Sequence, residues 1–294
     1  MLSKKNISIP GLVLKIIIAW AMIAFVVYPV VSLLIQTFWQ DGSLTTDVVG
    51  KVFSSARAVK SLKNSFILAF TLVVTVNIVG TLCVLFTEYW DIKGANILRL
   101  SYMTSLIYSG VVLVSGYKYV YGANGLLTKL LLMVFPNMNP NWFVGYGAVV
   151  FVMTFSCTQN HMMFLKNAIH SLDYHTVEAA KNMGAGGATI FFKVVLPVLK
   201  PTFFAITILT FLTGLGAMSA PLIVGGENFQ TINPMIITFS RSTYSRGVAA
   251  FLAIILGIAT IILLSVFSRI EKSGNYVSVS KTKAKLTMEK INNP

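Results

Sequence analysis

The sequence predicts an all-α membrane protein with six transmembrane helices, and three observations lead to this fold class. Hydrophobic residues make up 55% of the 294 residues, and only 11% are charged, against roughly 25% in an average soluble domain. The mean hydropathy is +0.77. The apolar residues gather in long runs, and about 20 apolar residues suffice for a helix to cross a bilayer. These values exclude a soluble globular protein.

Six segments have the length and composition of a membrane span. They are Ile16–Trp39, Ser65–Thr87, Ile97–Tyr119, Trp142–Leu165, Thr202–Val224 and Val248–Phe267. The first is too long for a secretory signal and has no small-residue cleavage site, so we expect it to be retained. The third is the weakest, because Arg99 lies near its start and it contains several hydroxyl side chains. The spans define a membrane domain over residues 16–267, between an N-terminal segment 1–15 and a basic tail 268–294.

The basic residues predict the orientation of these spans. The chain carries 23 Lys and Arg against 9 Asp and Glu, a formal net charge of +14. With the N-terminus inside, 15 of the 23 basic residues fall on the inner side, in agreement with the positive-inside rule. We therefore expect a multi-pass protein of the bacterial cytoplasmic membrane with both termini in the cytoplasm. The positive charge is expected to face anionic lipid of the bilayer and not nucleic acid.

The inner connection between the fourth and fifth spans, residues 166–201, has helical periodicity where a simple loop would have none. Asp173 is expected to cap a helix that runs to Met183, and Gly184 is expected to end it, because glycine adopts the left-handed conformation at a helix C-terminus without steric cost.

A second short helix is predicted over roughly Ala188 to Val195. We expect it to end before Pro197, and Pro201 suits the first turn of the fifth span. Two short amphipathic helices at the inner membrane surface would form a platform for a partner protein.

A motif with fixed spacing lies within this connection. It consists of Glu178, Ala179, Ala180, Gly184, Val194, Leu196 and Pro197. The spacing resembles the EAA signature of the permease subunits of binding-protein-dependent ABC importers, with Val194 in place of the usual isoleucine. SLKNSFILAF, which enters the second span, and SAPLIVGG, near the end of the fifth, are similar to the same family. The resemblance extends from about Ser61 onward.

The resemblance implies a type I ABC importer permease-like fold, with cytoplasmic coupling helices between helices 4 and 5. In that family the loop, here Leu172 to Leu196, docks into a cleft of an ATP-binding subunit. Gly184 would supply the turn, Ala179 and Ala180 would allow close approach to the partner, and Glu178 would offer a carboxylate to a basic residue.

The resemblance also implies the partners of the chain. They are two ATP-binding cassette ATPase subunits, a second permease subunit that is identical or homologous, and an extracellular substrate-binding lipoprotein. The chain lacks the G-x-x-x-x-G-K-[ST] phosphate loop. We therefore expect no catalytic residue and no cofactor bound by this chain, with ATP and Mg²⁺ held by the partner ATPase.

Histidines do not suggest a metal site, because His161, His170 and His175 are not spaced for ligation from one helix face. Polar residues within the spans are candidates for a translocation path. These are Asn77, Tyr108, Ser109, Thr154, Asn160, His161 and Thr213. Hydrogen bonding between helices is the alternative for these residues, and packing or interfacial placement is the alternative for His161.

The substrate is predicted from the stretch Ser219 to Gly226, which resembles permeases for ferric iron, polyamines, thiamine and phosphonates. We rank ferric iron first, then polyamine, then phosphonate or thiamine. Relatives often carry an acidic residue shortly before the proline, where this chain has Gly216, Ala217 and Met218. This departure weakens any assignment based on that position.

Two alternatives and one unexplained cluster remain. A stand-alone secondary transporter or channel is the main alternative, although no span carries Asp or Glu in its middle. A membrane-embedded enzyme has no catalytic constellation to support it. Four outer basic residues contradict the positive-inside rule, and they could dock an acidic lobe of the binding protein. They are Lys51, Arg57, Lys60 and Lys63.

Overall fold

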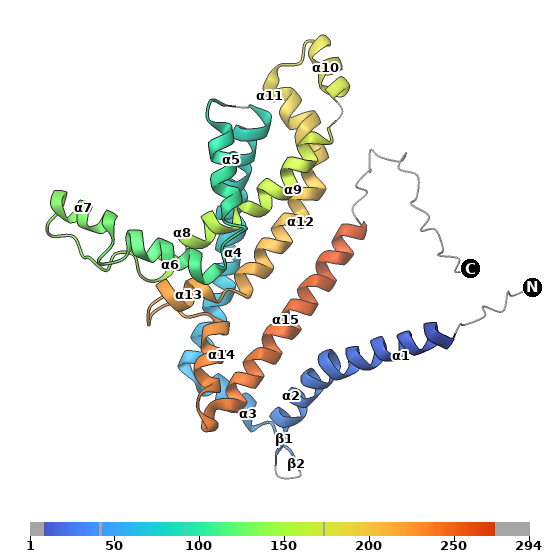
Figure 1. The fold of residues 1–294 in the computed structure, drawn as a ribbon, viewed down its shortest axis with the longest axis vertical. Helices are drawn as coiled ribbons and strands as arrows, with labels where there is room; N and C mark the ends of the chain where they lie inside the picture. Colours follow the sequence, from blue (N-terminus) through green and yellow to red (C-terminus); the bar gives the residue numbers. More distant parts are fainter. Residues whose placement is uncertain (1–8, 41–42, 91, 173, 274–294) are drawn as a thin grey trace, which may run out of the picture.

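The computed structural model describes residues 9–40, 43–90, 92–172 and 174–273. Within these ranges the regular elements are helices apart from a single pair of two-residue strands (Figure 1), which confirms the predicted all-α class. Asp173, most of the basic tail and the first eight residues lie outside the described residues.

The elements follow one another along the chain in a simple order. They are α1 (Ile9–Met22), the π-helical turn η1 (Ile23–Val27), α2 (Tyr28–Phe38), β1 (Trp39–Gln40), β2 (Ser43–Leu44), α3 (Asp47–Ser54), α4 (Ala56–Val84), the π-helical turn η2 (Leu85–Tyr89), α5 (Ala95–Thr104), α6 (Gly110–Tyr121), α7 (Leu126–Val134), α8 (Tyr146–Cys157), α9 (Gln159–His170), α10 (Tyr174–Asn182), α11 (Gly187–Ile190), the π-helical turn η3 (Phe191–Val195), α12 (Leu196–Leu215), α13 (Ser219–Val224), α14 (Ile232–Ser240), the 3₁₀ turn η4 (Thr243–Ser245) and α15 (Arg246–Ser273). β1 and β2 form an antiparallel hairpin in which Trp39 lies opposite Leu44.

Five helices in the described ranges are long and apolar enough to cross a membrane. They are Val13–Ile35, Ala56–Tyr89, Tyr146–His170, Gly187–Leu215 and Arg246–Arg269. They correspond to the predicted first, second, fourth, fifth and sixth spans. The first of these helices buries no residue of its most apolar segment against the rest of the chain. Its apolar surface is therefore available to lipid or to a partner.

The third predicted span, Ile97–Tyr119, is not one helix but is divided between α5 and α6, and the count of six transmembrane helices stays a prediction. The chain leaves helix after Thr104 and re-enters it at Gly110. Hydroxyl groups satisfy the backbone at this break: Ser105 donates to the carbonyl of Tyr102 at 2.6 Å, and Ser109 accepts from the amide of Val112 as an N-cap. Helices of 10 to 12 residues reach only about 15–18 Å.

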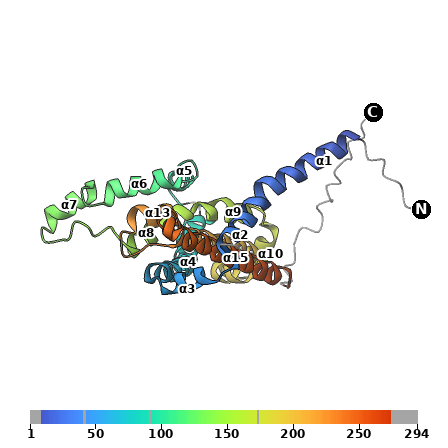
Figure 2. The ribbon, with the colours of Figure 1, turned by 90° about the horizontal axis from the view of Figure 1, so that it is seen from below.

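The break sends α6 in a new direction. α5 runs alongside α9, whereas α6 packs against α13 and buries Val114 in the main apolar cluster, and α7 extends beyond the bundle, as Figure 2 shows most clearly. We call α6 and α7 the lateral arm. Exposed apolar side chains along it include Val111, Tyr119, Leu130 and Met133.

The fifth span begins earlier than predicted. The expected short helix over Ala188 to Val195 does not end before Pro197, because α11, η3 and α12 form one helical rod from Gly187 to Leu215. Pro197 cannot donate a backbone hydrogen bond, and it follows directly on the wider π-turn, where the amide of Leu196 bonds to the carbonyl of Phe191. Pro201 lies inside α12. The rod ends at Leu215, with Gly216 as its C-cap, short of the predicted Val224.

α4 is the central helix of the bundle. It contacts α8, α9, α12 and α14, and its Leu68, Leu72 and Val76 are fully buried in the main apolar cluster. Gly214 of α12 lies so close to α4 that a Cβ there would stand 2.6 Å from the Cα of Ala69. The spans on either side are therefore positioned by α4.

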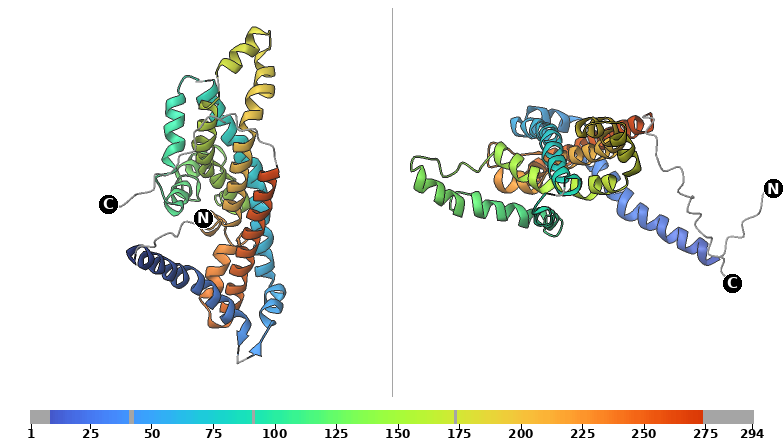
Figure 3. Two further views of the ribbon diagram at one scale, coloured as in Figure 1. Left: turned by 90° about the vertical axis from the view of Figure 1, so that its right-hand side faces the viewer. Right: turned by 90° about the horizontal axis from the view of Figure 1, so that it is seen from above.

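The bundle has two distinct ends. α10 and α11 lie at one end, whereas the β1–β2 hairpin and α3 lie at the other, as seen in Figure 3. α13 lies across the bundle between α12 and α14 (Figure 1). The coupling loop predicted from residues 166–201 is thus concentrated at a single end.

Candidate coupling site and interior polar cluster

The turn at Gly184 explains the spacing of the motif. Gly184 has φ of +81°, a conformation that glycine adopts without a Cβ penalty. Its amide bonds to the carbonyl of Lys181 at 2.9 Å, and the amide of Ala185 bonds to the carbonyl of Ala180 at 3.0 Å. These two bonds define a Schellman motif. The four-residue step from the second alanine to the glycine is the step from the C3 to the C′ position of that motif.

The two adjacent alanines of the motif differ in burial. Ala180 is only 7% exposed and packs in an apolar cluster with Leu165, Ile190 and Val195, whereas Ala179 is exposed. Ala185 packs against the same cluster, as the apolar contact of a Schellman motif requires. Ala180 therefore packs α10 against the neighbouring helices of the same chain, and Ala179 is the alanine that remains accessible to a partner.

Glu178 lies on the accessible side of α10. Its side chain is 55% exposed, and one carboxylate oxygen lies 3.7 Å from Nδ1 of His175. The carboxylate can therefore reach a basic group from outside the chain.

The second half of the motif belongs to the rod. Val194 lies in η3, Leu196 and Pro197 begin α12, and Val194 and Leu196 are half-buried while Pro197 is exposed. The π-turn and the Schellman turn flank α11, so both halves of the motif mark departures from regular α-helix.

Asn77 and His161, two of the proposed path residues, lie together inside the bundle. Nε2 of His161 on α9 is 3.2 Å from Oδ1 of Asn77 on α4, and the amide of Asn77 donates to Thr207 of α12 at 3.2 Å. His161 is fully buried, and its Nδ1 has no hydrogen-bond partner. Gly80 makes room for the ring. This interior polar cluster joins three helices.

The other path residues do not gather around it. Thr154 is buried and hydrogen-bonds to Thr75 at 2.8 Å, which joins α8 to α4. Tyr108, Ser109 and Thr213 are exposed, and Asn160 is half-buried. The exposed residues remain accessible from outside the chain, whereas the buried ones support contacts between helices. A role of any of them in translocation stays a prediction.

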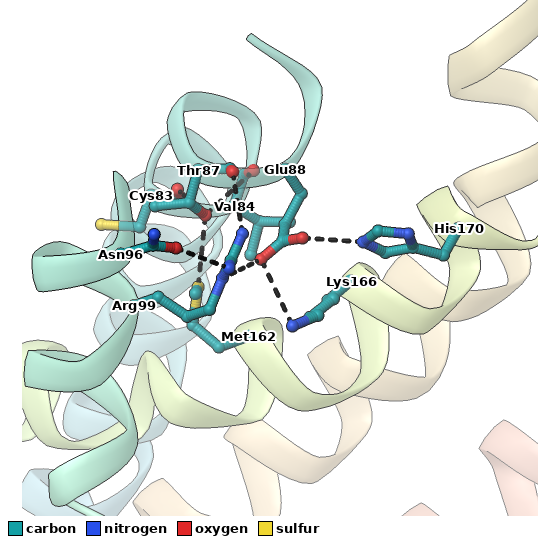
Figure 4. Close-up of polar contacts among 9 residues, drawn as sticks. All are labelled: Cys83, Val84, Thr87, Glu88, Asn96, Arg99, Met162, Lys166 and His170. Carbon is teal, nitrogen blue, oxygen red and sulfur yellow. Dashed lines mark hydrogen bonds and ion pairs between the residues drawn. The ribbon is translucent and has the colours of Figure 1, made fainter. Parts of the chain in front are cut away.

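Sequence reasoning missed a charged cluster near the coupling loop, which we call the Glu88 cluster: Glu88, Arg99, Lys166 and His170. Figure 4 shows three basic side chains directed at the carboxylate of Glu88, which ends the second span. Nε of Arg99 lies 2.7 Å and Nζ of Lys166 3.6 Å from one oxygen, and Nε2 of His170 lies 2.7 Å from the other. The signal in the sequence was an acidic residue, Glu88, directly after the long apolar run of the second span. Basic residues follow it on two later segments that are predicted to lie on the inner side.

The described residues offer no metal centre, since no three His, Cys, Asp or Glu side chains among them gather closely enough to hold an ion. Cys83 and Cys157 are buried free cysteines.

Comparison with known proteins decides the family. The family described as binding-protein-dependent transport system inner membrane component matches residues 99–273. A relative from Sinorhizobium fredii, y4fN, named as an ABC transporter permease protein, is 35% identical over 280 residues, which cover 95% of this chain and 49% of the relative. The chain belongs to this permease family. It is therefore a multi-pass protein of the inner membrane.

More distant relatives carry names that include a substrate. The ferric transport system permease protein FbpB of Actinobacillus pleuropneumoniae is 23% identical over 69% of this chain and 30% of the relative. PhnU of Salmonella typhi, named for 2-aminoethylphosphonate transport, is 21% identical over 77% of this chain and 79% of the relative. The chain spans about half the length of y4fN and less than a third of FbpB.

Solved structures confirm the predicted permease fold. A bacterial alginate ABC transporter in complex with an alginate-bound periplasmic protein superposes with a TM-score of 0.73 at 16% identity, covering 92% of this chain and 97% of that one. The methionine transporter MetNI in an inward-facing conformation gives a TM-score of 0.55 at 16% identity, covering 78% and 98%.

Proposed function

We propose that this chain is the permease subunit of an ATP-driven importer and forms the translocation path for a small solute delivered by an extracellular binding protein. The observation that carries the proposal is the coupling loop at one end of the bundle. Its Schellman turn presents Glu178 and Ala179 outward, and Ala180 fastens it to the apolar cluster that holds the ends of α4, α9 and α12. A displacement of α10 would thereby be transmitted to three spans.

The family resemblance suggests the partners that we propose. Two ATP-binding subunits would hold ATP and Mg²⁺, and one would dock on Glu178, Ala179 and Gly184 of this chain. A second permease subunit, identical or homologous, would complete the path, and a substrate-binding lipoprotein would act from outside. The alginate and MetNI structures, which are ABC transporters and in one case a complex with a periplasmic protein, support partners of this kind.

Ferric iron is the substrate that we propose first, because FbpB relatives are named for ferric transport. A phosphonate is the second candidate, because the PhnU relatives match this chain over most of their own length. Polyamine and thiamine, suggested by the stretch Ser219 to Gly226, complete the set to be tested.

The proposed topology places the coupling loop and both termini in the cytoplasm and the β1–β2 hairpin outside. Two of the four outer basic residues contact aromatic rings: Nζ of Lys51 lies 5.8 Å from the ring centre of Tyr244, and the guanidinium of Arg57 lies 5.9 Å from that of Phe239. Such contacts help to pack α3 and α4 against the neighbouring helices. Lys60 and Lys63 are exposed, and they are the pair that we propose for docking an acidic lobe of the binding protein.

Uptake tests this function and its substrate together. A deletion strain carrying the chain on a plasmid is supplied separately with labelled ferric iron, 2-aminoethylphosphonate, spermidine and thiamine. We expect accumulation of iron that depends on ATP and on the coupling loop. Transport by the reconstituted chain alone, driven by an ion gradient and indifferent to ATP, would establish the secondary transporter instead.

A further inference from the structure

Glu88 is buried in a way that demands compensation. Its side chain is only 2% exposed, and an ionised carboxylate in such a position is strongly unfavourable unless it is paired and hydrogen-bonded. Both of its oxygens have basic partners at 2.7 Å, and Lys166 lies 3.6 Å from one of them. The interior polar cluster has no comparable set of charges.

The Glu88 cluster joins three separate elements. Glu88 lies in the π-turn η2 that ends the second span, Arg99 lies on α5, and Lys166 and His170 lie on α9. Arg99 also donates to the carbonyl of Thr87 at 3.2 Å and to Oδ1 of Asn96 at 3.0 Å. The fixed fork of a guanidinium suits such multiple contacts, so Arg99 holds α5 to the end of the second span in one orientation.

Few other contacts hold α5: Tyr102 packs against the apolar cluster that contains Leu165, and Ser105, directly after α5, donates to Oε1 of Gln159 on α9 at 2.9 Å. Ala95 is the one residue of α5 that is buried, and its neighbours are η2 and α9. α5 leads through the break at residues 105–109 into the lateral arm. The ion pair between Arg99 and Glu88, together with the bond from Arg99 to the carbonyl of Thr87, is therefore the polar attachment of the first half of α5.

The same cluster touches the base of the coupling loop. His170 is the last residue of α9, and α10 begins at Tyr174. Leu165 and Ile169 of α9 pack in the apolar cluster with Ala180 of α10 and with Val84 and Leu85 beside Glu88. Apolar contacts therefore connect α10 to α9, and the Glu88 carboxylate connects α9 to α5.

We propose that Glu88 is a positioning residue that locks α5 and the lateral arm to α9, so that the arm moves with the coupling loop when the ATP-binding subunits act. Glu88 would bind neither ATP nor solute. This inference rests on the proposed function, since it assigns the route by which the coupling loop moves the remainder of the membrane domain. The cluster stays closed throughout the cycle and serves as a rigid connection.

Spin-label distances test the connection directly in the full-length chain. Labels are placed at Ile97→Cys on α5 and Asn167→Cys on α9, both exposed positions, and a chain without introduced cysteines measures labelling of Cys83 and Cys157. We expect a single narrow distance distribution that Glu88→Gln broadens or shifts. An unchanged distribution in Glu88→Gln would overturn the proposal, whether or not any ATPase subunit associates with the chain.

ATP hydrolysis by the whole complex tests the consequence for coupling. We expect complexes with Glu88→Gln or Lys166→Met to assemble. In both, the stimulation of ATP hydrolysis by the binding protein should be at least fivefold smaller than in the wild type. Matched controls are Lys93→Met, an exposed cation just before α5, and Glu227→Gln, an exposed carboxylate in the connection between α13 and α14, and both should keep full stimulation. Full stimulation in both cluster variants would contradict the proposal.

Two further results separate the possible failures. If Glu88→Gln does not fold, Arg99→Lys takes its place, because lysine keeps the charge but lacks the planar fork of the guanidinium. The proposal then requires the α5–α9 distance and the stimulation of ATP hydrolysis to change together in Arg99→Lys. If the wild-type chain associates with no ATPase, the proposed function fails while the distance measurement still decides whether Glu88 holds α5 to α9.

Discussion

Single residues at the proposed coupling site and in the interior polar cluster act mainly through backbone geometry and close packing. A Cβ at Gly184 would meet no atom within 4 Å, so a need for glycine there comes from the positive φ and not from crowding. The opposite holds at Gly80, where a Cβ would overlap the ring of His161. The two glycines therefore predict different consequences of the same substitution to alanine.

Gly184→Ala should weaken the association with the ATP-binding subunit. A non-glycine residue in the left-handed conformation costs about 1–2 kcal/mol, which corresponds to about a five- to thirtyfold loss of affinity if the turn must be kept on docking. Gly184→Asn should bind more nearly like the wild type, because asparagine tolerates this conformation better. Affinity can be measured by titrating the ATP-binding subunit onto the chain in nanodiscs.

Gly186→Ala is the matched control for this change. Gly186 has φ of −69° and no atom within 4 Å of a built Cβ, so alanine fits its backbone. Equal affinities for the two alanine variants would contradict the importance of the turn.

Gly80→Ala should destabilise the fold itself. The added methyl group must push α4 and α9 apart at the interior polar cluster, and overpacking of this kind costs about 1–3 kcal/mol. Gly257→Ala on α15, where a Cβ meets nothing within 4 Å, should be neutral or stabilising by up to about 1 kcal/mol. Thermal unfolding followed by tryptophan fluorescence in detergent distinguishes them, and equal midpoints would show that the helices yield at no cost.

At the scale of elements, the coupling loop is divided between a face that packs and a face that remains available. α10 turns Ala180 into the cluster shared by α9, α11 and α12, while Glu178 and Ala179 point outward. The two adjacent alanines allow these functions to be separated by experiment.

Ala180→Leu should destabilise the chain by about 1–3 kcal/mol, because the larger side chain overfills a packed site. Ala179→Leu should leave the unfolding temperature of the chain unchanged and reduce the copurification of the ATP-binding subunit, because its side chain faces outward. Unfolding curves and copurification yields are measured for both variants. The reverse pattern, with Ala179→Leu the less stable, would mean that α10 is rotated relative to the arrangement described here.

The whole molecule is organised by its two ends, which the positive-inside rule assigns to opposite sides of the membrane. The assignment places Lys181 on α10 inside and Lys60 on α4 outside, and both residues are exposed. The connection between α6 and α8 should lie on the outer side together with Lys60.

Lys60→Cys should react with a membrane-impermeant maleimide in intact spheroplasts, whereas Lys181→Cys should react only after the membrane is opened. The two native cysteines are buried and should contribute little background, which the unmodified chain measures. Labelling of Lys181→Cys in sealed spheroplasts would invert the proposed topology.

Much of this fold could be predicted from local signals. Apolar runs located the five long helices. Gly184 marked the end of α10, because a Schellman turn needs a residue in the left-handed conformation and glycine adopts it most easily. The third span failed because hydropathy does not register the hydroxyl hydrogen bonds of Ser105 and Ser109 that break it. The rod from Gly187 to Leu215 was divided wrongly because a π-turn accommodates Pro197 inside a helix.

The sequence by itself determined the class of protein, the spacing of the coupling motif and the segment that carries it, because these depend on composition and on hydrogen bonds between residues close in the chain. Only the tertiary structure decided that Ala180 packs inward, that His161 meets Asn77, and that Glu88 gathers cations from α5 and α9. Those contacts join residues from separate helices. Their partners are fixed by how α4, α9 and α12 pack, which no local pattern specifies.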